Sequence, residues 1–286
     1  MQRWTSLFPK LLHDLKNKLH HLRVSYWSAF VFHRPHELLA VLRSLVIGSR
    51  QMTCSKFVFS IMPSNNYLQE VLQHISTIPG IVPAQRKASK FSYSFSNKTF
   101  VEQLVIWDTI WHNGNIFWVR MHAFFFLERN IRNKEALKQM WPVVMKWQDD
   151  IDDWGLCDAL AKIYTNILVV LPDEVYNQLT KWNKDKSLWK RRQSLVSLLY
   201  YSRTKKEHPS FDKISKLITP LLGDKEYYVQ KAVGWTLREL HTVYPEQALP
   251  YFKKNIKSIS SIAFTIAIEK LNTGGKNKLK ALRKAK

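Results

Sequence analysis

Cysteine and long apolar runs are scarce in this chain. Its 286 residues include two cysteines, Cys54 and Cys157, too few for a disulfide framework or a cysteine-ligated metal site. This usage favours a reducing compartment. No apolar run approaches the ~20 residues that cross a bilayer, and residues 1–10 lack the apolar core and cleavage site of a secretory signal. The sequence therefore predicts neither a membrane protein nor a disulfide-stapled scaffold.

Several common catalytic signatures are also missing. The sequence contains no P-loop, no Gly-rich dinucleotide fingerprint and no nucleophile elbow. The acidic pairs at 149–150 and 152–153 have no nearby His or Cys that would complete a metal site, so we expect them to act as caps. Cys157 lacks the His/Asn pattern of a catalytic thiol and is expected to be buried. We predict no metal and no cofactor.

Acidic residues are outnumbered two to one. The 44 Lys and Arg against 22 Asp and Glu give a formal net charge of +22, and the basic residues run from Arg3 to Lys286. Such an imbalance favours a polyanionic partner, nucleic acid before membrane. Eleven tryptophans add rigid aromatic surface.

The chain from about residue 98 onward reads as successive amphipathic helices with no convincing alternating strand. Turn and cap residues separate them, including Asn113-Gly114 and Pro172-Asp173. Earlier in the chain, helices are expected at 7–22, 36–47 and 67–75, and 88–100 is ambiguous. The later expected helices are 99–112, 116–130, 134–148, 154–171, 173–183, 188–203, 210–222, 227–243, 245–256 and 261–271.

An aromatic residue recurs at the start of every second helix. Trp118, Trp154, Trp189 and Tyr228 follow one another at steps of roughly 35 to 39 residues, the period of HEAT-like helical hairpins. The prediction is an all-α fold, an armadillo-type α-solenoid whose second helices line a concave basic face.

The domain boundaries follow from this pattern. Residues 66–273 are predicted to be the repeat domain, 1–65 a basic helical N-terminal extension, and 274–286 a solvated basic C-terminal tail. Because residues 1–60 are rich in Arg and Lys and poor in acids, an organelle transit peptide is the alternative interpretation of this segment.

The segment 226–240 is expected to form a helix with two faces. Its apolar residues recur at core spacing, whereas Lys231, Trp235 and Arg238 lie side by side at steps of four and three. A large aromatic between two cations suits a surface that meets sugar and phosphate. The alternative is a core Trp on a basic helix.

Asp158 and Arg192 are the other candidates for chemistry. Asp158 lies one helical turn after Trp154, and a carboxylate there could stabilise a developing positive charge; it could also be an ordinary solvated acid. Arg192 ends three consecutive cations near a helix start, an arrangement that an anion would relieve. That anion could be a phosphate of a nucleic acid, or the carboxylate of Asp185 or Asp158 in a salt bridge.

Together these segments resemble the AlkD-type DNA alkylation repair glycosylases over roughly residues 80–271. The longest match, 228–239, is similar to the family's Ile-Gln-Lys-Ala-Ile-Gly-Trp-x-Leu-Arg-Glu. Trp154-Gly-Leu-Cys-Asp158 resembles Trp-Asp-x-x-Asp, with Gly155 in place of the middle acid. Trp189-Lys-Arg-Arg192 resembles Trp-x-x-Arg, and the segment 80–86 resembles an entry phrase that ends in Arg86. Tyr200 stands where the family is usually basic.

The resemblance implies a HEAT-like fold and a monofunctional DNA glycosylase of base excision repair. It would release cationic purines such as 3-methyladenine and 7-methylguanine from duplex DNA, as a monomer without an obligate protein partner. We expect it in the cytoplasm on the nucleoid, or in the nucleus or an organelle of a eukaryote. The expected catalytic residues are Asp158, Trp154, Trp235 and Arg192. The expected DNA contacts are Arg86, Trp189, Lys190, Arg191, Arg203, Lys231 and Arg238.

Two other functions fit the same features. The chain could be a noncatalytic solenoid that binds damaged or branched DNA, or an adaptor that binds an acidic protein or RNA.

Overall fold

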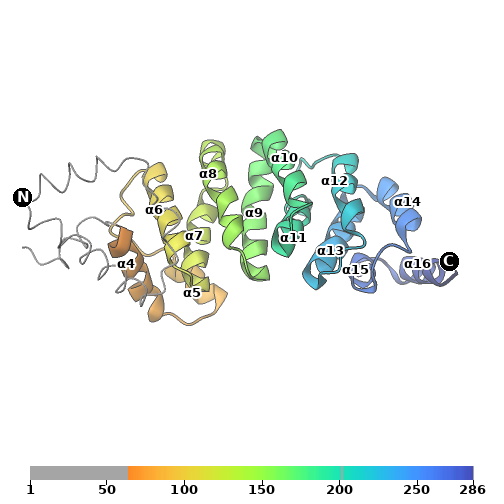
Figure 1. The fold of residues 1–286 in the computed structure, drawn as a ribbon, viewed down its shortest axis with the longest axis horizontal. Helices are drawn as coiled ribbons and strands as arrows, with labels where there is room; N and C mark the ends of the chain where they lie inside the picture. The colour runs from red at the N-terminus through yellow and green to blue at the C-terminus, as the bar shows by residue number, and fades with distance from the viewer. Residues whose placement is uncertain (1–63, 201, 286) are drawn as a thin grey trace, which may run out of the picture. The chain divides into compact units, whose positions relative to one another are not determined.

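The computed structural model describes residues 64–200 and 202–285, and within these ranges it contains helices and no strand (Figure 1). The expected all-α fold is confirmed. The helices at 7–22 and 36–47 and nearly all of the expected N-terminal extension lie outside the described residues. The elements, with 3₁₀ turns written η, are α4 (Ser64–Ser76), α5 (Val82–Ala88), α6 (Phe100–Asn113), α7 (Phe117–Arg129), α8 (Lys134–Trp147), η1 (Gln148–Asp150), α9 (Trp154–Val170), α10 (Pro172–Trp182), α11 (Leu188–Val196), η2 (Ser202–Thr204), α12 (Phe211–Ile218), η3 (Thr219–Leu221), α13 (Tyr227–Val243), α14 (Pro245–Asn255), α15 (Ser261–Ala267) and α16 (Thr273–Ala285).

The helices pack as successive hairpins. The second helices α7, α9, α11, α13 and α15 each contact the next. The first helices meet their neighbours more sparingly: α6 packs against α8, and side chains such as Trp141 with Trp182 and Phe211 with Tyr251 link α8 to α10 and α12 to α14. Figure 1 shows the pairs following one another from α6 and α7 onward. Trp118, Trp154, Trp189 and Tyr228 are the first or second residues of α7, α9, α11 and α13. The aromatic period therefore marks the repeats of an α-solenoid.

Local sequence explains where most helices start. Thr99 and Glu102 form a capping box at α6, and Asp153 caps α9 by accepting from Gly155 N at 2.6 Å. Pro172 and Pro245 open α10 and α14, positions where the missing N–H costs no helical hydrogen bond. The expected capping role of the 152–153 pair is confirmed for Asp153.

The structure differs from the sequence prediction at three elements. The helix expected at 188–203 ends at Val196, and the Ser202 hydroxyl beyond it donates to Glu239. The helix expected at 210–222 changes to 3₁₀ geometry at Thr219–Leu221, where Pro220 has no N–H to donate. Helix α5 was not expected at all.

The expected solvated tail at 274–286 also differs. Residues 273–285 form α16, whose Leu279 side chain is buried. The Arg283 guanidinium donates to the carbonyl oxygens of Ile256 and Ile259 at 3.1 and 2.8 Å. The sequence analysis missed this helix because its composition is mostly basic, yet it packs against the repeats through Leu279.

The core runs along the whole described domain. Trp111 and Trp147 are fully buried and stacked, with centroids 4.2 Å apart. Cys157 is fully buried as expected, and burial raises the pKa of its thiol well above the usual range.

Helices α13 and α15 approach closely at Gly234. A Cβ at position 234 would stand 2.6 Å from the Ala263 carbonyl oxygen and 2.8 Å from its Cα. Backbone atoms cannot move aside as a side-chain end can, so only glycine allows this approach.

Gly234→Ala should therefore destabilise the protein by about 2 kcal/mol, because the overpacking cost exceeds the gain in helix propensity. Gly223→Ala is the matched control, since a Cβ there would meet nothing within 4 Å. Urea unfolding of the three proteins measures the difference. Equal midpoints for the two variants would refute the close α13–α15 packing.

A polar cluster joins α6 to η1. His112 lies 2.7 Å from Asp150 and 3.4 Å from Asp108, and the buried indoles of Trp111 and Trp147 donate to the same two carboxylates. Hydrogen bonds to Asp108 and Asp150 raise the pKa of His112 from 6.5 to about 9. The folded protein therefore holds this proton more tightly than the unfolded chain.

Because the folded pKa is the higher one, the stabilisation is complete below about pH 6.5 and is lost as the pH rises through about 9. We expect His112→Gln to lower stability at pH 6.5 by on the order of 1 kcal/mol, since solvent screens this partly exposed group. The difference between wild type and variant should shrink between pH 6.5 and 9.5. If urea unfolding gave a constant difference across that range, protonated His112 would not stabilise the fold through Asp108 and Asp150.

Candidate active site and nucleic-acid interface

A pocket of about 640 Å³ opens between the second helices α9, α11, α13 and α15 and the η2 turn. Asp158 comes from α9, Arg192 from α11, and Lys231 and Trp235 from α13. Tyr200, Arg203, Arg238 and Glu239 contribute further walls. Residues far apart in sequence, but at equivalent repeat positions, thus meet in one place.

Asp158 and Arg192 form a bidentate ion pair across α9 and α11. Arg192 Nη2 donates to Asp158 Oδ1 and Oδ2 at 2.7 and 3.0 Å, and Nε donates to Oδ1 at 3.1 Å. Arg192 Nη1 donates to the Tyr228 carbonyl oxygen of α13 at 2.9 Å. Of the alternatives left open by the sequence, the salt bridge to Asp158 is the one the structure contains. Arg192 is 8% exposed, so the carboxylate is held in a fixed orientation.

Burial raises the pKa of Asp158 above its usual value, and the Arg192 guanidinium opposes part of that rise. The positive charge of Lys231 also opposes it. The carboxylate is thus a partly desolvated acceptor next to two cations, an environment in which its charge acts strongly on nearby groups.

An aromatic wall stands beside this pair. Trp235 is half-buried and packs against Tyr200 with centroids 5.9 Å apart. The Lys231 ammonium lies 5.3 Å from the centroid of Tyr227. Lys231, Trp235 and Arg238, which the sequence places side by side on α13, all line the pocket that Asp158 lines.

Glu239 forms the base of the pocket and was not singled out by the sequence. Its buried carboxylate accepts from Ser202 at 2.8 Å and from Arg238 and Lys270 at 3.2 Å each. Burial favours a higher pKa for Glu239, but the Ser202 and Lys270 hydrogen bonds outweigh it and lower the pKa. The Glu that ends the 228–239 match was the available signal. Its contacts link η2 and the turn after α15 to α13.

Trp154 lies on α9 one turn before Asp158 and is 54% exposed, but it is not among the residues lining the pocket. The adjacent Gly155 suits the Asp153 cap, because a Cβ at 155 would stand 2.8 Å from Asp153 Oδ1. A side chain there would displace the oxygen that caps α9. Glycine at 155, where the family has Asp, therefore lets Asp153 cap the start of α9.

Two expected DNA contacts remain available for an anion. Arg203 is exposed on η2 and Lys231 is half-buried on α13, and both line the pocket. Neither forms an ion pair within the described part of the chain.

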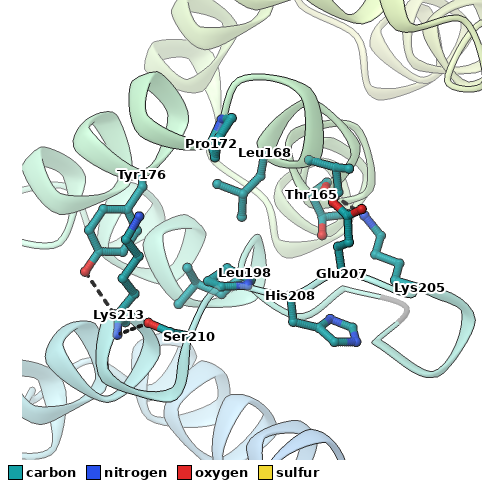
Figure 2. A pocket seen from close by; sticks show the side chains of 12 residues that line it. Thr165, Leu168, Pro172, Tyr176, Leu198, Lys205, Glu207, His208, Ser210 and Lys213 are labelled. Atoms are coloured by element: carbon teal, nitrogen blue, oxygen red, sulfur yellow. Dashed lines mark hydrogen bonds between the residues drawn. The ribbon is translucent and has the colours of Figure 1, made fainter.

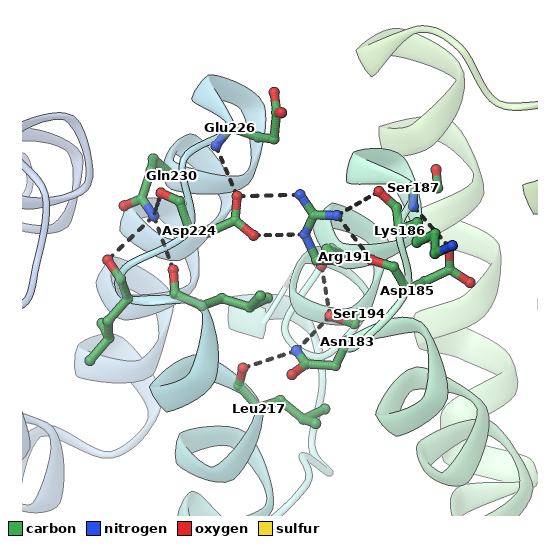
Figure 3. Close-up of polar contacts among 12 residues, drawn as sticks. Asn183, Asp185, Lys186, Ser187, Arg191, Ser194, Leu217, Asp224, Glu226 and Gln230 are labelled. Atoms are coloured by element: carbon green, nitrogen blue, oxygen red, sulfur yellow. Dashed lines mark hydrogen bonds and ion pairs between the residues drawn. The ribbon is translucent and has the colours of Figure 1, made fainter.

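The other basic residues of the expected interface are engaged inside the fold. Arg191 donates to both Asp224 oxygens and to the carbonyl oxygens of Asp185 and Lys186 (Figure 3). Lys190 lies 2.7 Å from Asp149. These contacts join the α10–α11 and η3–α13 connections. We therefore leave Arg191 and Lys190 out of the proposed DNA contacts.

Three further expected residues also have protein partners. Arg86 pairs with Glu128 and lies over the Phe125 ring. Arg238 pairs with Glu239 and Glu269. Trp189 packs on Tyr228 with centroids 5.1 Å apart. The Arg86 side chain remains exposed, so it can still contact a phosphate. Trp189 instead packs between α11 and α13.

No group of three His, Cys, Asp or Glu that could hold a metal occurs among the described residues. None of the helices that the structure describes is long and apolar enough to span a membrane.

Comparison with known proteins assigns the chain to a family. Residues 77–271 match the family model described as DNA alkylation repair enzyme. The chain belongs to the DNA alkylation repair enzyme family. The match covers the helices that build the pocket, from α9 to α15.

Two solved structures are similar in fold. A predicted DNA alkylation repair enzyme from Enterococcus faecalis is 16% identical, with a TM-score of 0.55 over 73% of this chain and 95% of that one. AlkD2 from Streptococcus mutans is 20% identical, with a TM-score of 0.51 over 73% of this chain and 100% of that one. No curated protein matches the chain. At these identities the neighbours support the solenoid fold.

Replacing Arg191 should change stability, whereas replacing Arg203 should change DNA binding. Arg191→Met removes bonds inside the fold and should lower the unfolding midpoint, because Asp224 is left nearly buried without its partner. Arg203→Met should leave the midpoint unchanged and weaken binding to undamaged duplex. It should also reduce the slope of log affinity against log salt by about 0.9. An unchanged slope for Arg203→Met would exclude a phosphate contact there.

Proposed function

We propose that this protein is a monofunctional DNA glycosylase that releases cationic N-alkylated purines, such as 3-methyladenine and 7-methylguanine, from duplex DNA. The observation that carries the proposal is the fixed Asp158 carboxylate, held by Arg192 in a basic pocket beside Trp235. Membership of the DNA alkylation repair enzyme family supports it.

The chemistry of such a lesion suits this site. Alkylation at a purine ring nitrogen makes the base cationic and therefore a good leaving group, so little acid catalysis is needed. As the N-glycosidic bond breaks, positive charge develops on the deoxyribose, as in other glycosidic cleavages. A preorganised carboxylate stabilises that charge most effectively in a partly desolvated pocket. Asp158 would supply the charge and orient the attacking water.

Arg192 has a different role from the phosphate contact that its place among three consecutive cations allowed. Its three bonds to Asp158 and its bond to Tyr228 O fix the carboxylate in one orientation. We therefore assign Arg192 the role of a positioning residue. The phosphates would instead meet Arg203, Lys231 and Arg86.

The aromatic residues would hold the lesion. Trp235 presents its ring to the pocket, and Trp154 stands exposed one turn away from Asp158. Contact between an indole face and a cationic nucleotide contributes about 0.5–1 kcal/mol when exposed and more when desolvated. Such a surface would favour charged lesions over neutral bases.

A lyase would need an amine nucleophile in the pocket, which Lys231 and Lys270 line; Lys270 pairs with Glu239, so the amine to consider is Lys231. Its position beside the Tyr227 ring favours a phosphate or lesion contact through charge. The protein would act as a monomer on duplex DNA, on the nucleoid in a bacterial cell, or in the nucleus or an organelle of a eukaryote.

Asp158→Asn keeps the shape of the side chain and removes its charge. Excision of 7-methylguanine should fall by about 10²–10³, the loss typical for one electrostatic stabiliser. Duplex affinity should stay level or rise, because a negative charge leaves a basic groove. Chromatography of released bases from methylated DNA measures the first effect, and fluorescence anisotropy the second.

The same assay separates the alternatives. Uracil and hypoxanthine, which are neutral lesions and poor leaving groups, should not be released. Undiminished excision by Asp158→Asn would eliminate the carboxylate mechanism. Lesion binding without any excision by wild type would indicate a noncatalytic DNA-binding solenoid, and binding to RNA or acidic protein in preference to DNA would indicate an adaptor.

A further inference from the structure

A second pocket, of about 270 Å³, lies apart from the one that contains Asp158 and shares no lining residue with it. It is formed by the C-terminal half of α9, the start of α10, and the segment that leads from η2 into α12 (Figure 2). Leu168, Pro172, Leu198 and the Tyr176 ring give it an apolar lining.

Lys205 is the buried cation of this pocket, which Glu207 and Lys213 also line; Lys213 pairs with Asp173 and lies over the Tyr176 ring. The Lys205 Nζ donates to the Thr165 carbonyl oxygen at 2.6 Å, and no carboxylate pairs with it within the described residues. Burial lowers the pKa of Lys205 to about 8. An ammonium group has three N–H donors, so two remain for another acceptor. An anion bound there would restore the charge that burial disfavours.

A shallower depression of about 330 Å³ adjoins the pocket, because Val169, Lys205 and Glu207 line both. It adds three exposed cations, Arg132, Lys134 and Lys206. None of the three forms an ion pair among the described residues. Four cations against the single carboxylate of Glu207 leave this depression strongly positive, and Lys205 stands at the boundary between the apolar and the basic half.

We propose that the two depressions form one binding site for a mononucleotide, with the base in the apolar pocket and the phosphates over the basic depression. A planar base suits a pocket walled by Leu168, Pro172, Leu198 and the Tyr176 ring. Lys205 would bind the first phosphate, and Arg132, Lys134 and Lys206 would bind the next. Sites for ligands of this size are commonly several hundred Å³, apolar with a few placed charges.

Isothermal titration of the full chain with adenosine, AMP and ADP tests the site. Affinity should rise from AMP to ADP, because each added phosphate meets further cations, and adenosine alone should bind at least tenfold more weakly than AMP. Lys205→Met should weaken ADP binding by roughly tenfold or more, the effect of losing one charged hydrogen bond. Lys216→Met is the matched control, an exposed lysine on α12 outside both depressions, and should bind ADP as wild type does.

Three results would overturn the proposal. Equal ADP affinity for wild type and Lys205→Met would remove Lys205 from any site. Pyrophosphate binding as tightly as ADP would show a polyanion patch without a base pocket. Displacement of ADP by a short undamaged duplex would make the depression part of a DNA track.

Discussion

The position of one guanidinium controls the geometry of the proposed active site. Arg192 on α11 binds the Asp158 carboxylate of α9 and the Tyr228 carbonyl oxygen of α13, so it ties three successive second helices at a single point. A catalytic carboxylate must be oriented within a fraction of an ångström to act on a developing charge. In an α-solenoid, where each repeat contacts mainly its neighbours, such a cross-repeat bond fixes the register on which the pocket depends.

The large positive charge divides into two populations. Part of it stabilises the fold: Arg191 with Asp224, Lys190 with Asp149, and Arg283 with the carbonyl oxygens near the end of α14. The rest, including Arg203 and Lys231, is free of carboxylate partners in the described part of the chain and can attract phosphate. Net charge alone predicts a polyanionic partner but does not tell which cation meets it. The positions of Asp224 and Asp149, and of the carbonyl oxygens that Arg283 meets, separate the two populations.

The fold could be predicted further than the site. Aromatic spacing and cap residues predicted the all-α repeats, because both depend on local sequence, as at Asp153 and Trp118. The breaks after Val196 and Ile218 were missed, since they depend on a tertiary bond from Ser202 to Glu239 and on Pro220 inside an apolar run. Spacing brought Asp158, Arg192 and Trp235 to one pocket. It did not predict the bidentate ion pair or the role of Glu239, because their partners come from other repeats.

A crystal structure of Asp158→Asn bound to a duplex with one 7-methylguanine tests the central claim most directly, because the variant should leave the lesion intact. We expect the C1′ atom of the lesion sugar within about 4 Å of the side chain at 158, at hydrogen-bond or van der Waals range, with Trp235 against the nucleotide and Arg203 or Lys231 on its phosphates. A lesion more than about 10 Å from residue 158, one helix diameter, or duplex bound on another face, would contradict that claim.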